Sequence, residues 1–150
     1  MLYCSAENID KSQYSFELRR IESLYNVPII YGRRTYHDPQ TAIESSPELL
    51  LFDIRNMKTG PINLFKRELY EHFGVRSDLH ENLWEYEQYI RTAPVAIEAL
   101  KAIGAAGNDT TIIAHEFMGM PTALAAILEE QCNFKTIFYA HETATIRNLI

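Results

Sequence analysis

The stretch that decides the fold runs from Thr111 to Glu142 and reads TIIAHEFMGMPTALAAILEEQCNFKTIFYAHE. It contains two short apolar runs, Thr111–Ala114 and Thr136–Ala140, and each run ends in the tripeptide Ala-His-Glu. Between them, Pro121–Gln131 carries apolar residues at helical spacing. Apolar runs of strand length that flank a helix of about three turns predict a β-α-β unit with two parallel strands.

The repeated tripeptide predicts a ligand site at one edge of this unit. A right-handed crossover would bring His115 and Glu116 to the same edge as His141 and Glu142. Open α/β sheets bind their ligands at this edge, beyond the carboxyl ends of the strands. Imidazole and carboxylate groups there can transfer protons, ligate metals or bond to sugar hydroxyls. A single histidine could simply cap its strand, but two copies at equivalent places favour a site.

The residues between the first strand and the helix predict a tight turn. Gly119 and Pro121 suit such a turn, because proline is tolerated in the first turn of a helix. Backbone N–H groups at the helix N-terminus could then hold an anion or a sugar hydroxyl. An ordinary connecting turn would use the same residues.

The remainder of the chain predicts a Rossmann-like α/β domain, with a parallel sheet and helices on both faces. Further strands are expected at Leu2–Ser5, Val27–Tyr31 and Leu49–Ile54, helices at Asp10–Tyr25, from Asn63 to Gly74 and at Glu81–Ile103, and a loop or short hairpin connection at His37–Pro47. Pro94 predicts a kink, or two helices with Thr92 capping the second. Trp84, Tyr86 and Tyr89 are expected in the core or on a helix face.

Length and composition indicate one soluble domain at residues 1–150, with a formal charge of −6 and a pI near 5.3. This acidic balance argues against a non-specific nucleic-acid partner. No apolar run approaches the roughly 20 residues of a membrane span, and no secretory signal is evident. Cys4 and Cys132 are expected to be reduced thiols in a cytoplasmic protein. Because the chain stops at Arg147–Ile150, where a helix should begin, we expect a fragment of a longer protein.

Two segments carry a family resemblance. Ile113–Gly119 (IAHEFMG) and Thr136–Thr145 (TIFYAHETAT) resemble the N-terminal half of glycogen and starch synthases and related glycosyltransferases. In that group a strand ends in His-Asp/Glu-Trp-x-x-Gly, and the next strand ends in a threonine- and histidine-containing stretch. Phe65–Tyr70 (FKRELY) is similar to an Arg-Glu-Leu-Tyr-like segment of the group. The resemblance covers roughly Leu50–Ile150.

The resemblance implies one half of a GT-B fold, in which two Rossmann-like domains face each other across a cleft. The N-terminal domain of such enzymes mainly holds the glycan acceptor. The C-terminal domain binds a nucleotide-sugar donor such as UDP- or ADP-glucose, and neither a metal nor another cofactor is required. The expected activity is retaining hexosyl transfer, and the expected partners are the acceptor, the donor and a C-terminal domain. Because this chain lacks the donor domain, we expect it to be inactive alone.

The resemblance also implies roles for individual residues. His141 falls on the histidine near the transferred sugar and would be catalytic, through orienting the donor sugar or bonding to the reacting centre. The expected substrate-binding residues are His115, Glu116, Gly119 and Glu142. Phe117 stands where the family has tryptophan, with one residue fewer before the glycine, and the glycine-rich first loop of the family is missing.

Two other functions fit the same residues. His115, Glu116, His141 and Glu142 are acceptable ligands for zinc or manganese, which would make a metal-dependent hydrolase. Adjacent residues of a strand point to opposite faces, however, so at most one of each pair would reach a common ion unless the chain turns sharply. The third possibility is a non-catalytic Rossmann-like binding module.

Overall fold

The computed structural model describes residues 14–107 and 109–140. These residues form four α-helices, one 3-10 helix and six strands, and the strands pair into three separate two-stranded sheets. The predicted α/β class is therefore confirmed. A continuous Rossmann-like parallel sheet is not seen within these residues, because β5 and β6 are the one parallel pair among them.

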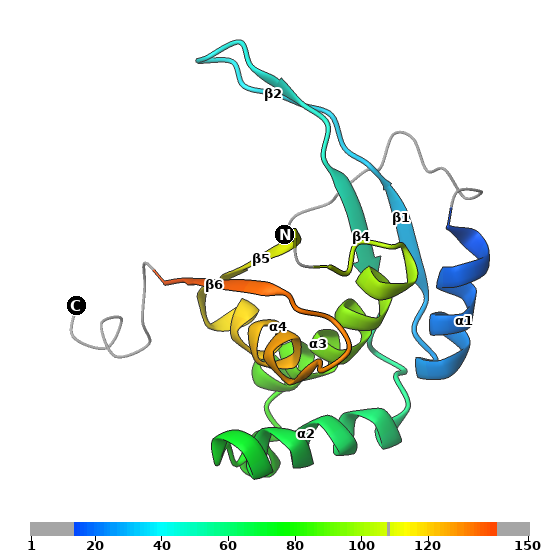
Figure 1. Ribbon diagram of the computed structural model, residues 1–150, viewed down its shortest axis with the longest axis vertical. Helices are drawn as coiled ribbons and strands as arrows, with labels where there is room; N and C mark the ends of the chain where they lie inside the picture. The colour runs from blue at the N-terminus through cyan, green and yellow to red at the C-terminus, as the bar shows by residue number, and fades with distance from the viewer. Residues whose placement is uncertain (1–13, 108, 141–150) are drawn as a thin grey trace.

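The first part of the described chain is a helix followed by a long hairpin. Helix α1 (Ser15–Tyr25) precedes β1 (Ile29–Arg33), which pairs antiparallel with β4 (Glu48–Phe52). Strands β2 (Tyr36–His37) and β3 (Glu44–Ser45) continue this hairpin to its tip, away from the helices (Figure 1). Of the two alternatives predicted for His37–Pro47, a loop or a hairpin connection, the structure shows the hairpin.

The antiparallel pairing of β1 and β4 corrects the prediction of a parallel sheet. A parallel crossover needs a dozen or more residues, usually in a helix, to return to the starting edge. Here the connecting residues pair with each other instead and turn the chain back directly. The last pair of residues in the register, Arg33 and Glu48, forms an exposed ion pair, with 2.8 Å between Nη2 of Arg33 and Oε1 of Glu48.

Helix α2 (Thr59–Phe73) begins earlier than predicted, so Asn63 lies inside it and does not cap it. Gly74 ends this helix in the left-handed conformation, with φ of 67°, as its position predicted. A short 3-10 helix, η1 (Ser77–His80), then leads to α3 (Trp84–Ala102).

Helix α3 continues through Pro94, so the second of the two predicted alternatives, two separate helices, is wrong, and the predicted kink stays a prediction. Thr92 does not cap a second helix, because its hydroxyl donates to the Gln88 carbonyl one turn earlier, at 2.7 Å. Proline removes one backbone hydrogen bond, but neighbours bury this helix on several sides. Its buried apolar residues are Ile90, Ala93, Val95, Ile97 and Ala99.

The predicted β-α-β unit is confirmed. Strand β5 (Thr111–His115) leads into α4 (Glu116–Leu128), which is followed by the parallel strand β6 (Lys135–Tyr139). Helix α4 packs between the two strands and α3 (Figure 1). On the opposite face of the strands, Ile113 and Ile137 are 65% and 51% exposed. No helix of the described chain covers that face, in contrast to the predicted helices on both faces.

Several predictions fall outside the described residues. They are the strand at Leu2–Ser5, the start of the helix predicted at Asp10–Tyr25, the helix expected to begin at Arg147, and the site residues His141 and Glu142.

A buried ion cluster ties α2 to α3. Glu87 is 3% exposed, and its Oε2 lies 2.9 Å from Nζ of Lys66 on α2. Its Oε1 accepts a hydrogen bond from Nε of Arg91, one turn along α3, at 3.2 Å. A carboxylate that is so little exposed to solvent is tolerated only when it is paired.

Replacing Glu87 with alanine should destabilise the protein by about 3 kcal/mol, because Lys66 would remain buried without this partner. Urea unfolding measures the difference. Glu71→Ala is the matched control, since the pair that Glu71 makes with Arg67 is exposed and 3.8 Å long. It should cost less than about 1 kcal/mol. Equal losses in the two variants would contradict a stabilising role for the cluster.

Candidate functional site

The carboxyl ends of β5 and β6 lie side by side, as the sequence predicted. His115 is the last residue of β5 and stands opposite Tyr139, the last residue of β6. Their rings are stacked, with centroids 5.5 Å apart and planes inclined by 22°. Both side chains are exposed. An imidazole and a phenol ring thus lie against each other at the edge where α/β proteins bind ligands.

The strand register differs from the alignment that the repeated tripeptide suggests. The sequence repeat would place Ala140 opposite Ala114, and hence His141 opposite His115. In the structure Ala114 stands opposite Phe138, so the two copies are offset by two residues along the ladder. Tyr139 therefore takes the position beside His115 that the repeat assigned to histidine. Sequence reasoning did not select Tyr139, because register is set by pairing between strands.

Glu116 makes the sharp turn from β5 into α4. It is buried and has φ of 58°, in the left-handed region that residues other than glycine rarely adopt. Helix α4 consequently begins immediately after His115, five residues before the predicted start at Pro121. The prediction of a tight turn at Gly119 and Pro121 is wrong, since both residues lie inside the helix.

Gly119 is required by close packing. A Cβ atom at this position would lie 2.8 Å from the carbonyl carbon of Ala114 and 2.9 Å from its Cα. Real Cβ atoms essentially never approach backbone this closely. The absence of a side chain lets the first turns of α4 lie directly against the end of β5, which fixes where His115 stands relative to the helix.

This arrangement suits recognition of polar ligands by hydrogen bonds. His115 occupies the N-cap position of α4, and no side chain caps the helix there. The first N–H groups of a helix have no partner within the helix and carry a partial positive charge. The exposed imidazole can donate or accept a hydrogen bond beside them. Hydroxyl groups and anions are both suitable ligands for such an edge.

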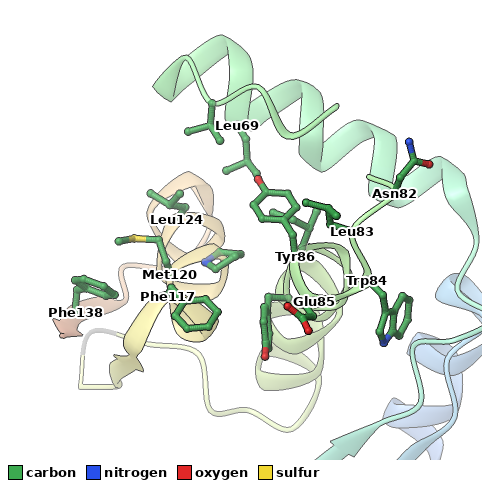
Figure 2. A pocket seen from close by; sticks show the side chains of 14 residues that line it. Leu69, Asn82, Leu83, Trp84, Glu85, Tyr86, Phe117, Met120, Leu124 and Phe138 are labelled. Atoms are coloured by element: carbon green, nitrogen blue, oxygen red, sulfur yellow. The ribbon is translucent and has the colours of Figure 1, made fainter. Parts of the chain in front are cut away.

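A large apolar pocket lies nearby, between α2, α3 and α4, with a volume of about 810 Å³ (Figure 2). It is lined by Leu69, Val75, Asn82, Leu83, Trp84, Glu85, Tyr86, Tyr89, Ile90, Phe117, Met120, Pro121, Leu124 and Phe138. The Phe117 ring packs edge-on against Tyr89, with centroids 5.8 Å apart. Trp84, Tyr86 and Tyr89, which were predicted to lie in the core or on a helix face, therefore line this open pocket.

The metal-site interpretation stays a prediction. Two of its four proposed ligands, His141 and Glu142, lie outside the described residues. Among residues 14–107 and 109–140, no three His, Cys, Asp or Glu side chains are grouped as metal ligands would be.

Comparison of the chain with protein-family profiles gave no match, and comparisons with curated proteins and with solved structures gave none either. Within the described part of the chain, no helix has the length and apolar character needed to cross a membrane.

The substitution Gly119→Ala should destabilise the protein by about 1–3 kcal/mol, because the added methyl group forces α4 away from β5. Thermal or urea unfolding measures this loss. Gly60→Ala is the matched control: Gly60 also lies in a helix, and a Cβ there would meet nothing within 4 Å. That variant should change the free energy of unfolding by less than about 1 kcal/mol, because the following Pro61 offsets part of the gain that alanine brings to a helix. If both variants behaved alike, the close contact with Ala114 would not be a constraint.

Proposed function

We propose that this chain is the acceptor-side domain of a retaining, nucleotide-sugar-dependent glycosyltransferase, related in kind to glycogen and starch synthases. The observation that carries the proposal is the pairing of β5 with β6. It brings His115, the residue of the IAHEFMG motif at which β5 ends, beside Tyr139 of the second motif, at which β6 ends. These are the two segments on which the family resemblance rests.

The chemistry of this edge supports a sugar ligand. A sugar ring has apolar C–H faces that can lie on an aromatic surface, and hydroxyls that need hydrogen-bonding partners. An outward ring face of the exposed, stacked pair of His115 and Tyr139 offers the surface, and the imidazole together with the α4 N-terminus offers the partners.

Each site residue then has a distinct role in the proposed enzyme. His141 orients the donor sugar or bonds to the reacting centre, and Glu142 lines the cleft beside it. His115 contacts the acceptor, while buried Glu116 and close-packed Gly119 hold the turn that presents it. A second, C-terminal domain of a longer cytoplasmic protein supplies the donor site and stabilises the leaving diphosphate with cationic groups and helix N-termini.

The proposal is tested by titrating the purified chain with maltooligosaccharides, ADP-glucose and UDP-glucose, followed by NMR. Oligosaccharides should bind weakly and the nucleotide sugars hardly at all. His115→Ala should weaken oligosaccharide binding roughly tenfold, the equivalent of one good hydrogen bond. His37→Ala is the control, because His37 is an exposed residue near the hairpin tip; its affinity should match that of the unmodified chain.

Two results would contradict the proposal. If the nucleotide sugars bound as tightly as the oligosaccharides, the chain would not be the acceptor-side domain. Stoichiometric zinc or manganese in the purified chain, lost in His115→Ala, would instead favour a metal-dependent hydrolase.

A further inference from the structure

The apolar pocket is a groove with two helical walls, and we refer to it as the α3–α4 groove. One wall is a stripe on α4, formed by Phe117, Met120, Pro121 and Leu124 at positions i, i+3, i+4 and i+7. The other wall comes from the start of α3 and includes Leu83, Tyr86 and Ile90 at i, i+3 and i+7. Spacing of this kind marks the face of a helix that packs against another helix.

Several side chains that line the groove are exposed to solvent. Phe117 is 52% exposed, Leu83 58%, Trp84 48% and Phe138 43%. Contiguous apolar surface of this kind marks an interaction site. An open groove between two helical stripes has the shape that accepts a third helix, whose side chains at i, i+3 and i+7 enter it in the helix-in-groove mode.

The rim of the groove carries an unbalanced negative charge. Glu81, between η1 and α3, and Glu87, in the first turn of α3, both form ion pairs with Lys66, and Glu87 also pairs with Arg91. Glu85 lines the groove, and within the described residues its carboxylate has no ion-pair partner. In Figure 2 it projects from α3 between Trp84 and Phe117. A cation on the bound helix would complement this carboxylate and the overall charge of −6.

The same lining argues against a sugar in this groove. The hydroxyl of Tyr86 is already bonded to the Ser77 hydroxyl, at 2.9 Å. The remaining polar groups of an otherwise apolar lining are the side chains of Asn82 and Glu85, the Tyr89 hydroxyl and the Trp84 indole N–H. A sugar placed here would lose most of its hydrogen bonds to water without replacement, which is unfavourable. The groove is thus distinct from the proposed acceptor edge.

We propose that the α3–α4 groove binds an amphipathic helix of a partner protein. The partner helix presents large apolar side chains at i, i+3 or i+4, and i+7 to the two walls. It carries a lysine or arginine that pairs with Glu85 at the rim.

Two synthetic helical peptides without tryptophan test the proposal. They share one Leu/Phe stripe and differ in having lysine or glutamate beside it. Trp84 is the single tryptophan of the chain, so its fluorescence reports occupancy of the groove directly. The lysine peptide should bind roughly tenfold more tightly than the glutamate peptide. Glu85→Gln should abolish that difference, whereas Glu130→Gln, at an exposed residue beyond α4, should preserve it.

A second pair of variants tests the apolar walls. Phe117→Ala should weaken binding of both peptides roughly tenfold or more, as loss of an aromatic anchor does. Phe16→Ala is the matched control, because Phe16 is an exposed phenylalanine on α1. Circular dichroism verifies that each variant is folded.

Three results would overturn the proposal: no binding at millimolar peptide, equal affinity for the two peptides, or self-association of the chain that Phe117→Ala abolishes. The last, measured by sedimentation, would assign the groove to a second copy of the chain. None of these outcomes depends on whether the chain binds glycans.

Discussion

The burial of α3 on several sides is the constraint that holds this molecule together. Within the described residues, the β1–β4 hairpin and the β5–β6 pair share no hydrogen bonds between strands, so no sheet joins them. Helix α3 packs against α1, α2 and α4 and thereby connects both strand pairs to one body. Ala93 and Ala99 are fully buried in it, and such small side chains let the neighbouring helices approach closely.

Elements set by local pattern were predictable from the sequence. Leu18, Ile21 and Tyr25 recur at helical spacing and form the buried face of α1. The two apolar runs of strand length likewise predicted the parallel strands β5 and β6. The start of α4 was not predictable, because it depends on contact between Gly119 and the backbone of Ala114. Sequence spacing carries no information about that contact.

The candidate site was predictable in its location but not in its composition. The parallel strand ends fixed the edge, and His115 stands there as expected. Tyr139 was not predicted, because the register of β6 against β5 depends on the pairing of the two strands and cannot be read from either strand alone. Adjacent residues of a strand point to opposite faces. Tyr139 thus stacks on His115 while Phe138 lines the groove, so the end of β6 serves two separate surfaces.

The left-handed backbone conformation of Glu116 limits which residues this position can accommodate without strain. Glycine adopts this conformation freely, whereas a residue with a Cβ gives up roughly 1–2 kcal/mol. A buried carboxylate is tolerated only when it is paired. A glutamate at this position therefore gives up backbone energy that a glycine would keep, and interactions of its side chain have to compensate for the difference.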